Sequence, residues 1–580
     1  MRSAGRGPDD PVKRYLEQIK PALGTIAALS VCVNALLLVP ALYMMQVFDR
    51  VLTSGSAATL VVLSLGAGLA LALMLLLDYL RSRLQGVAGT LLGESLLPLA
   101  IRSVLRRGAS SGQPASTEPL RDVATLRNLF STPALLAAFD APWLLIYVAI
   151  IWIIHPLLGL TAALAALAMF GIALLNDRLT RRSIEALQRE ASVTHAALES
   201  SMQNAEVAEA MGMSNALISR WQGLNARVLD LQGPTARRSV AMTATARALR
   251  QAVQVVMLGV GAWLVITKAA SPGVMIAATI LLGRALAPVE QVVAGWKLLA
   301  EGRAAHRRLG ALVDETEQRT VPMRLPSPHG VLSCSGVVWN PPGTERLVLA
   351  GVSFDLAAGE SLAVIGPSGA GKSTLIRLLA GLWRPRVGSV RLDGAEIADW
   401  PREDLGPHIG YVPQDVDLFD GTVAENIARL GEVDSDAVVT ASRMAGIHEL
   451  VLALPQGYDT RVERGAALLS PGQRQRIALA RALYGQPKLL LLDEPNANLD
   501  GAGEQALGEA LASLRGRVTV VIVTHRTTLL QNVDKMLMLE QGRAKHFGPV
   551  NDVLHAMRQG GAQVVAMPRH AVAHGAEHGR

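Results

Sequence analysis

A glycine-rich stretch in the second half of the chain has the composition of a phosphate-binding loop. Residues 366–374 read GPSGAGKST, and they lie between an apolar segment typical of a strand and the start of a helix. Glycines let backbone N–H groups curl around a β-phosphate, and a helix N-terminus adds partial positive charge. We expect Lys372 to bridge the β- and γ-phosphates of a nucleotide and Ser373 to bind Mg²⁺. The candidate nucleotide-binding residues of this loop are Gly366, Pro367, Ser368, Gly369, Ala370, Gly371, Lys372, Ser373 and Thr374.

Two carboxylates follow an unbroken apolar run downstream of this loop. Residues 489–495 read LLLLDEP, a pattern that predicts a buried strand of a parallel sheet. We expect Asp493, at the end of the strand, to hold the Mg²⁺ shell and Glu494 to polarise the attacking water. A strand ending in Asp-Glu is weak evidence alone, but its distance from a phosphate-binding loop makes it strong.

Further motifs resemble those of ATP-binding-cassette (ABC) ATPases. Residues 469–483, LSPGQRQRIALARAL, are similar to the signature motif of that family, and the resemblance extends over about Leu332–Val553. It implies that Gln414 senses Mg²⁺ and contacts the transmembrane domain, and that His525 reaches the γ-phosphate. The catalytic residues expected from the motifs are therefore Glu494, His525 and Gln414, and the expected metal ligands are Ser373, Gln414 and Asp493. The resemblance also implies nucleotide contacts from Ser470, Gly472, Gln473 and, in the loop 498–500, Asp500.

Two positions depart from the family pattern. The family has Gly-Gly where this chain has Pro471 and Gly472, and proline removes the N–H with which the first glycine could contact a ligand. The aromatic residue that stacks on adenine in many relatives is also not clearly matched. Trp339 is the nearest candidate, but an equally good interpretation places it in the core.

The composition indicates that the rest of the chain lies in a membrane. The chain has 580 residues, half of them hydrophobic, a mean hydropathy of +0.31 and a net charge of +7. Basic loops beside apolar spans explain this charge better than nucleic-acid binding, which would need a basic patch with aromatic residues. The only cysteines, Cys32 and Cys334, predict neither a disulfide framework nor a cysteine metal site.

The apolar runs predict six membrane spans. A run of about 20 residues spans a bilayer, and the charge-free stretch Ala141–Leu175 must be two helices broken at His155-Pro156, since one helix would be about 50 Å long. Arg-rich segments alternate with tight connections, which places both termini and the ATPase in the cytoplasm. The runs are Pro21–Met45, Leu60–Leu80, Ala141–Leu175, Ala252–Thr267 and Pro272–Trp296.

These features predict a six-helix, all-α transmembrane ABC exporter domain followed by an α/β P-loop nucleotide-binding domain. The expected parts are a cytoplasmic segment (1–20), the transmembrane domain (21–310), a Pro-punctuated linker (311–331), the ATPase (332–556) and a disordered tail (557–580). The tail histidines His570, His574 and His578 lack clustered carboxylates, so a metal role for them is the weaker interpretation.

One copy of each motif per chain implies a dimer. In ABC ATPases the signature motif of one subunit closes over the nucleotide held by the other, so six spans and one ATPase are the layout of a half-transporter that forms a homodimer. We expect Leu120–Phe130 and Glu206–Arg220 to form short transverse helices that rest on the ATPase, with Glu463 near the loop that touches them.

The membrane half is similar to the type I secretion permease/ATPase subfamily, which exports proteases, lipases and RTX proteins from Gram-negative bacteria. The resemblance rests on LYMMQVFDRVL (42–52), FDAPW (139–143), NAEVAEAMGM (204–213) and LLGRALAPVEQ (281–291). It implies an inner-membrane exporter of unfolded polypeptides with a C-terminal signal. It also implies a periplasmic adaptor (membrane fusion protein) and a TolC-type outer-membrane channel as partners, with membrane lipid around the spans.

Two further functions remain as alternatives. An ABC lipid flippase or small-molecule exporter would share the fold and motifs, whereas a non-transport ABC ATPase acting on nucleic acid would lack six spans. About twenty residues precede the first span, which leaves no room for an N-terminal peptidase domain, so we expect cargo with an uncleaved signal.

Arg284 lies in the middle of the sixth apolar run, where a charge is expensive unless it faces water or a partner. We expect Arg284 and Glu290 to line the translocation path, with Pro288 loosening the helix between them. The alternative is a snorkelling or paired structural arginine.

Overall fold

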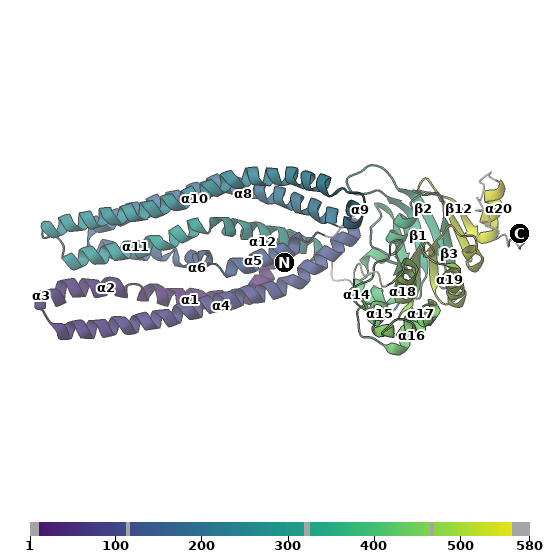
Figure 1. Cartoon of the computed structure of the whole chain (residues 1–580), viewed down its shortest axis with the longest axis horizontal. Coiled ribbons are helices and arrows are strands. Elements are labelled where there is room, and N and C mark those ends of the chain that lie inside the picture. Colours follow the sequence, from purple (N-terminus) through teal and green to yellow (C-terminus); the bar gives the residue numbers. More distant parts are fainter. Residues whose placement is uncertain (1–10, 112–115, 203, 318–324, 464–468, 560–580) are drawn as a thin grey trace, which may run out of the picture. The chain divides into compact units, whose positions relative to one another are not determined.

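The long apolar runs of the first half fold into long helices, and the motif-bearing second half folds around β-sheets (Figure 1). The computed structural model describes residues 11–111, 116–202, 204–317, 325–463 and 469–559. It contains two compact units that meet in the sequence near residue 320. The tail histidines and part of the linker expected at 311–331 lie outside the described residues.

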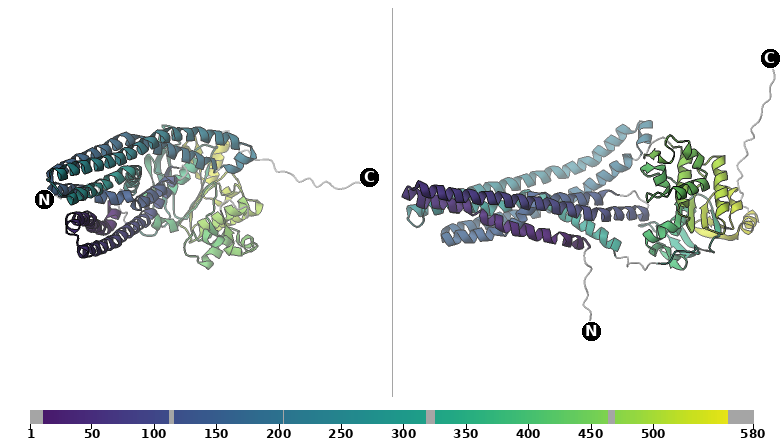
Figure 2. Two further views of the ribbon diagram at one scale, coloured as in Figure 1. Left: turned by 60° about the vertical axis from the view of Figure 1, so that its left-hand side comes forward. Right: turned by 90° about the horizontal axis from the view of Figure 1, so that it is seen from below.

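The first unit is helical throughout its described residues. Its helices α8 and α10 run side by side, as both sets of views show (Figures 1 and 2). The elements are α1 (Pro11–Leu36), α2 (Val39–Gln46), the π-helix η1 (Val47–Val51), α3 (Leu52–Ser54), α4 (Ala57–Ser111), α5 (Glu118–Phe130), α6 (Pro133–Asp140), α7 (Trp143–Ile154), α8 (Pro156–Met202), α9 (Ala205–Ala210), α10 (Ser214–Ile266), α11 (Pro272–Ala294) and α12 (Trp296–Glu317).

Five helical stretches are long and apolar enough to cross a membrane, and α6 with α7, bent by 46°, makes a sixth. With the bent pair taken as one span, this count agrees with the six spans predicted from the sequence. The break at His155-Pro156 is also confirmed, since α7 ends at Ile154 and α8 begins at Pro156. Helices α4, α8 and α10 have 55, 47 and 53 residues, so each extends well beyond the roughly 20 residues that a bilayer needs.

Three boundaries differ from the sequence-based prediction. Helix α1 already begins at Pro11, because proline is tolerated in the first helical turn. Helix α12 continues to Glu317, so the expected linker starts as helix. Helix α9 supplies a short helix at 205–210, but α10 begins at Ser214, within the range expected to be transverse.

Helix α5, expected to be a transverse helix, instead packs within the helical unit. Its buried Asp122 accepts hydrogen bonds from Nε and Nη2 of Arg308 on α12, at 2.9 and 2.5 Å. On another side, a Cβ at Gly89 of α4 would lie 2.7 Å from Cβ of Phe130, so α4 and α5 approach closely. The amphipathic pattern of α5 therefore serves packing between α4 and α12.

Two of the membrane motifs have structural roles in the helical unit. Asp49 of η1 accepts hydrogen bonds from the Ser271 hydroxyl at 2.6 Å and from the Gly273 N–H at 2.9 Å, so it satisfies donors at the N-terminus of α11. Asp140, from FDAPW, accepts hydrogen bonds from Arg81 at 2.9 Å and from the amide of Asn34 at 2.7 Å. These contacts connect helices that are far apart in the sequence.

Arg284 and Glu290, both expected to line the translocation path, lie in different surroundings. Glu290 is paired with Arg250 of α10 at 2.6 Å and with Arg247 at 3.5 Å. Arg284 is exposed and lines a cavity with residues of α1, α4 and α6. Glu290 follows Arg284 by six residues, which corresponds to about 600° of rotation around a helix. Because this is not a whole number of turns, the two side chains leave α11 in different directions.

The second unit contains a six-stranded sheet, a four-stranded antiparallel sheet and a two-stranded ribbon among its described residues. The six strands lie in the order β12-β11-β3-β10-β9-β6, all parallel except β12. The four-stranded order is β2-β1-β4-β5, and β7 pairs with β8. The strands are β1 (Leu332–Trp339), β2 (Leu349–Leu356), β3 (Ser361–Ile365), β4 (Val387–Leu392), β5 (Ala395–Glu396), β6 (Ile409–Val412), β7 (Gly421–Thr422), β8 (Arg461–Val462), β9 (Leu489–Asp493), β10 (Thr519–Val523), β11 (Lys535–Glu540) and β12 (Arg543–Pro549).

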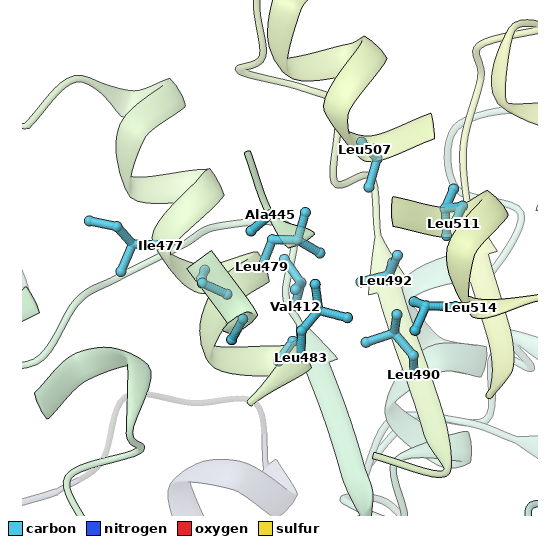
Figure 3. Packing of buried hydrophobic residues seen from close by; sticks show 14 of the residues in the cluster. Val412, Ala445, Ile477, Leu479, Leu483, Leu490, Leu492, Leu507, Leu511 and Leu514 are labelled. Carbon is cyan, nitrogen blue, oxygen red and sulfur yellow. The ribbon is translucent and has the colours of Figure 1, made fainter. Parts of the chain in front are cut away.

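The helices of this unit pack on the six-stranded sheet and on one another. All five side chains of β9 are buried, as its apolar run predicts. Side chains of β6, β9, α18 and α19 meet in one of the two cores of the unit (Figure 3). The helices are α13 (Lys372–Leu379), α14 (Arg402–Leu405), α15 (Val423–Ile427), α16 (Ser435–Met444), α17 (His448–Leu452), α18 (Pro471–Leu483), α19 (Gly501–Leu514) and α20 (Val550–Gln559), with the 3-10 turns η2 (Ile397–Asp399), η3 (Gly406–His408), η4 (Gly457–Asp459) and η5 (Leu529–Asn532).

Candidate functional site: a nucleotide-binding centre

The sheet order brings four motifs to one edge. Strands β3, β10, β9 and β6 are consecutive and parallel, so their carboxyl ends lie together, which is where ligands bind in open α/β sheets. β3 leads into the phosphate-binding loop, and β9 ends at Asp493. β10 is followed by His525, and β6 by Gln414. The residues predicted to act on phosphate therefore meet although they are distant in the sequence.

The backbone of the phosphate-binding loop needs glycine at specific positions. Gly371 has φ +98°, and a Cβ there would lie 2.7 Å from the side chain of Leu349 and 3.0 Å from the carbonyl of Val348. At Gly366, with φ +152°, a Cβ would lie 2.2 Å from the carbonyl of Leu539. Helix α13 begins at Lys372, directly after Gly371, so the loop leads into a helix N-terminus. The start of β2 and the end of β11 thus lie so close to the turn that a side chain is excluded at these two positions.

The Lys372 ammonium is already directed into the loop. Its side chain is buried, and Nζ donates hydrogen bonds to the carbonyls of Gly366 at 2.9 Å and Pro367 at 3.0 Å. Burial lowers the pKa of Lys372, while the carboxylates of Glu494 and Asp493 oppose this shift. A buried ammonium held by two neutral carbonyls suits an anionic ligand such as a phosphate.

Asp493 has the properties of a metal ligand. It is 1% exposed, and its Oδ1 atom has no hydrogen-bond partner in the described part of the protein. Burial raises the pKa of Asp493, and a hydrogen bond from Ser373 opposes the shift. Buried carboxylate oxygens without a partner are costly unless a cation binds them, and carboxylate and hydroxyl oxygens are ligands that Mg²⁺ accepts. Ser373 and Asp493 therefore fit a magnesium ion.

Glu494 is held between the loops that follow β6 and β10. Gln414 Nε2 donates a hydrogen bond to Glu494 Oε2 at 3.3 Å, and His525 Nε2 lies 3.2 Å from Oε1. The backbone of Glu494 has φ +50°, a conformation that is uncommon outside glycine, and its N–H donates to the Val523 carbonyl at 3.0 Å. The three residues predicted to be catalytic thus form one hydrogen-bonded group.

The signature motif forms the start of α18. Ser470 is the N-cap: its hydroxyl accepts from the Gln473 N–H at 3.2 Å, and its own N–H donates to the Gln473 side chain at 2.8 Å. Pro471 occupies the first helical position, where proline fits because that N–H has no intrahelical acceptor. The departure from Gly-Gly is therefore compatible with a capped helix, although the proline still offers no N–H.

Two contacts fix the loop containing Asp500 against α18. A Cβ at Gly472 would lie 2.7 Å from the carbonyl of Asn498, so this glycine permits close approach. Arg476 of α18 forms an ion pair with Asp500, which also caps α19 by accepting the Gly503 N–H at 2.8 Å. A backbone N–H and the guanidinium lower the pKa of Asp500. The sequence analysis did not name Arg476 as a partner of Asp500, although Arg476 lies within the signature motif and could have been considered there.

The structure places Trp339 in the core. Its side chain is 8% exposed and stacked on Trp383, with ring centroids 4.4 Å apart and an interplanar angle of 8°. The Arg377 guanidinium lies over Trp383 at 5.0 Å. Little ring surface of Trp339 is left for an adenine, so the core interpretation accounts for this residue.

Arg429 is a further residue that sequence analysis missed. Its guanidinium donates to the carbonyls of Arg481, Ala482 and Tyr484 at the end of α18, at 3.1, 3.2 and 3.0 Å, and to that of Gly406 at 2.7 Å. A cation at a helix C-terminus satisfies the last carbonyls and complements the helix dipole. Arg429 therefore positions α18, whose other end carries the signature motif. Because Arg429 lies 52 residues before Arg481, sequence spacing gave no signal.

We expect Arg429→Ala to lower the stability of the ATPase unit by about 1–3 kcal/mol, because it leaves carbonyls unpaired. By the usual scaling, thermal melting of the full-length protein should fall by several °C. Arg517→Ala, which removes an exposed arginine of the same unit, is the control and should melt like the wild type. Equal melting of the two variants would contradict the role given to Arg429.

Comparisons with known proteins agree with this geometry. Residues 349–497 match the ABC transporter family model, and residues 23–288 match the ABC transporter transmembrane region. The chain is 41% identical over 556 residues, 95% of each chain, to the type I secretion system ATP-binding protein PrsD of Rhizobium meliloti (strain 1021). It is 27% identical to the leukotoxin export ATP-binding protein LtxB of Aggregatibacter actinomycetemcomitans, over 90% of this chain and 75% of that protein.

A solved structure is similar over nearly the whole chain. A bacterial Atm1-family ABC exporter with ATP bound matches with a TM-score of 0.80, covering 94% of this chain and 97% of that one. At 24% sequence identity this likeness shows the fold alone. Together with the family models it confirms the predicted fold class, a transmembrane exporter domain followed by an ABC ATPase.

Proposed function

Because the chain belongs to the type I secretion ABC exporters, we propose that it exports an unfolded polypeptide carrying a C-terminal signal. The observation that carries this proposal is the 41% identity over 95% of a type I secretion ATP-binding protein. The ABC family match means that the protein binds ATP and couples its hydrolysis to transport. The leukotoxin exporter among the relatives favours a protein cargo.

We propose a role for each residue of the ATPase site. Lys372 binds the β- and γ-phosphates, and the loop N–H groups surround the β-phosphate. Glu494 orients the attacking water and accepts its proton, while Gln414 and His525 hold the carboxylate in place. Ser373, Asp493 and Gln414 would hold Mg²⁺, which would supply positive charge beside the phosphate oxygens.

We propose that two copies of the chain form the working transporter. Each chain has one phosphate-binding loop and one signature motif, and a site made from both needs a second subunit. In the homodimer, Ser470, Gly472 and Gln473 of one subunit would contact the nucleotide bound by the other, with Asp500 at the interface. The Arg476–Asp500 ion pair supports this arrangement because it holds Asp500 against α18, the helix that carries the signature motif.

The six spans make this a multi-pass membrane protein. We propose that it lies in the bacterial inner membrane with its ATPase unit and both termini in the cytoplasm. Its partners would be a periplasmic adaptor (membrane fusion protein) and a TolC-type outer-membrane channel, which would complete a path from the cytoplasm to the exterior. We expect no nucleic-acid partner, because the basic residues of this chain lie beside apolar membrane spans.

Export into the medium tests the proposal. The exporter is co-expressed with an adaptor, a TolC-type channel and an RTX protein, and the medium is assayed for cargo. We expect cargo in the medium only when its C-terminal segment is present and Glu494 is intact. ATP-dependent flipping of a labelled lipid in proteoliposomes, with no export of any C-terminally tagged protein, would instead support the flippase.

A further inference from the structure

A cavity of about 580 Å³ lies among α1, α4, α6 and α11 of the helical unit. This volume lies within the range of about 300–1,000 Å³ that is typical of ligand sites. One part of its wall is apolar, with Val33, Leu37, Met74 and Leu136. The remainder carries charged and amide groups, so the cavity suits a ligand with both apolar and polar parts.

Most of the charge in the cavity is already compensated. Arg81 is 8% exposed and forms ion pairs with Asp78 at 2.7 Å and with Asp140 at 2.9 Å. Asp140 accepts a further hydrogen bond from Asn34. This group of three charges has one cation for two carboxylates, so it carries one net negative charge, and Nε of Arg81 has no hydrogen-bond partner among the described residues.

Arg284 is the exception. Its side chain is exposed at the cavity, and it forms no ion pair within the described ranges of the chain. It lies twelve residues after Pro272, about 18 Å along α11 by the helical rise, within a helix that is long and apolar enough to cross a membrane. Gln291, two turns further on, lines the same cavity. This face of α11 thus presents one guanidinium without an ion pair among the described residues and one amide.

A guanidinium within such a helix favours an anion. Charge in the membrane interior is costly without a partner or water, and arginine binds carboxylates through two parallel hydrogen bonds. Asp140 is not available as that partner because Arg81 donates to both of its carboxylate oxygens and Asn34 donates to Oδ1. The anion that Arg284 suits must come from outside the charged group of the cavity.

We propose that this cavity is a subsite for an acidic residue of the exported polypeptide. Arg284 binds the carboxylate, and the apolar wall takes an adjoining aliphatic side chain. The inference rests on the proposed function, since it takes the cargo to be a polypeptide. It names a specificity-determining residue in the membrane unit, separate from the ATPase site.

Peptide binding to the full-length protein tests the subsite. The probes are two fluorescein-labelled ten-residue peptides, one alternating Asp with Leu and the other alternating Asn with Leu. Fluorescence anisotropy is measured for the wild type, Arg284→Gln, Arg284→Lys and Arg83→Gln in phosphatidylcholine nanodiscs. Arg83 is exposed and does not line the cavity, so Arg83→Gln is the matched control. Size-exclusion chromatography and thermal melting confirm that each variant is folded.

We expect the wild type and Arg83→Gln to bind the Asp peptide about tenfold or more tightly than the Asn peptide, from the strength of hydrogen bonds to charged groups. Arg284→Gln should abolish this preference, and Arg284→Lys should keep part of it. An unchanged preference in folded Arg284→Gln would overturn the inference. So would loss of Asp-peptide binding to the wild type when phosphatidylglycerol is added, because Arg284 would then be a site for lipid phosphate.

Failure of the subsite and failure of the proposed function are distinguishable. Secretion of the RTX protein by the wild type, with no effect of Arg284→Gln on peptide preference, would retain the function and reject the subsite. An Arg284-dependent preference without any secretion would retain a carboxylate site in the membrane unit and reject protein export. The two assays share no readout.

Discussion

Replacement of Glu494 by Gln should lower ATP hydrolysis by about 10²–10⁴-fold, the usual contribution of a general base, while ATP binding is retained. The reason is geometric: Gln414 and His525 hold the Glu494 carboxylate at 3.3 and 3.2 Å, and an amide of the same shape fills this place without accepting a proton. The purified full-length protein would be assayed for phosphate release and for ATP-dependent change in elution on size-exclusion chromatography. We expect a closed, nucleotide-bound dimer that accumulates.

The matched control for this change is Glu509→Gln, which alters an exposed glutamate of α19 and should hydrolyse ATP at the wild-type rate. His525→Ala should resemble Glu494→Gln because it removes the group on the other side of the carboxylate. If Glu494→Gln hydrolysed ATP as fast as the wild type in detergent, another group would have to orient the water, and the role given to Glu494 would be wrong.

The features that the sequence predicted depend on local pattern. The apolar runs and the His155-Pro156 break predicted the spans, because a membrane helix needs continuous apolar residues and proline disrupts a helix. GPSGAGKST and LLLLDEP predicted the ATPase site because strand, turn and helix follow one another directly there. Such short-range signals do not require knowledge of which elements pack together.

The features that the sequence missed depend on contacts between distant segments. The amphipathic pattern of α5 suits a transverse helix as well as one packed between α4 and α12, and the ion pair of Asp122 with Arg308 decides between them. Trp339 was left between two interpretations, and its stacking on Trp383, 44 positions away, is the long-range contact that places it in the core. The different directions of Arg284 and Glu290 are an exception, because they could have been predicted from the sequence alone. The 3.6-residue repeat of a helix directs the two side chains to different sides of α11.

The same distinction applies to the ATPase group. Each of Gln414, Glu494 and His525 was predicted from its own motif, but their mutual hydrogen bonds follow from the order of β6, β9 and β10 in the sheet. Strand order is a long-range property that one sequence does not display. The chemistry was therefore predictable, and the arrangement that couples its parts was not.

Removal of the Lys372 ammonium should weaken ATP binding by about 10–100-fold, the range expected for charge-assisted hydrogen bonds to phosphate. Lys372→Ala also deprives the Gly366 and Pro367 carbonyls of a donor, so the loop loses its internal support as well as a phosphate ligand. Burial already lowers the pKa of Lys372, so the free protein bears a cost for this ammonium that a bound phosphate offsets.

Because the buried ammonium is costly in the free protein, the effects of Lys372→Ala on thermal stability and on ATP binding can be measured separately. Without nucleotide, we expect the variant to melt within a few °C of the wild type, because removal of a partly desolvated charge compensates for the lost hydrogen bonds. With ATP, the wild type should gain stability by mass action, whereas the variant should gain almost none at the same ATP concentration. Lys488→Ala, which removes an exposed lysine of the same unit, should keep the full ATP-dependent gain. An ATP-dependent gain of wild-type size in Lys372→Ala would show that the loop binds phosphate through its N–H groups alone.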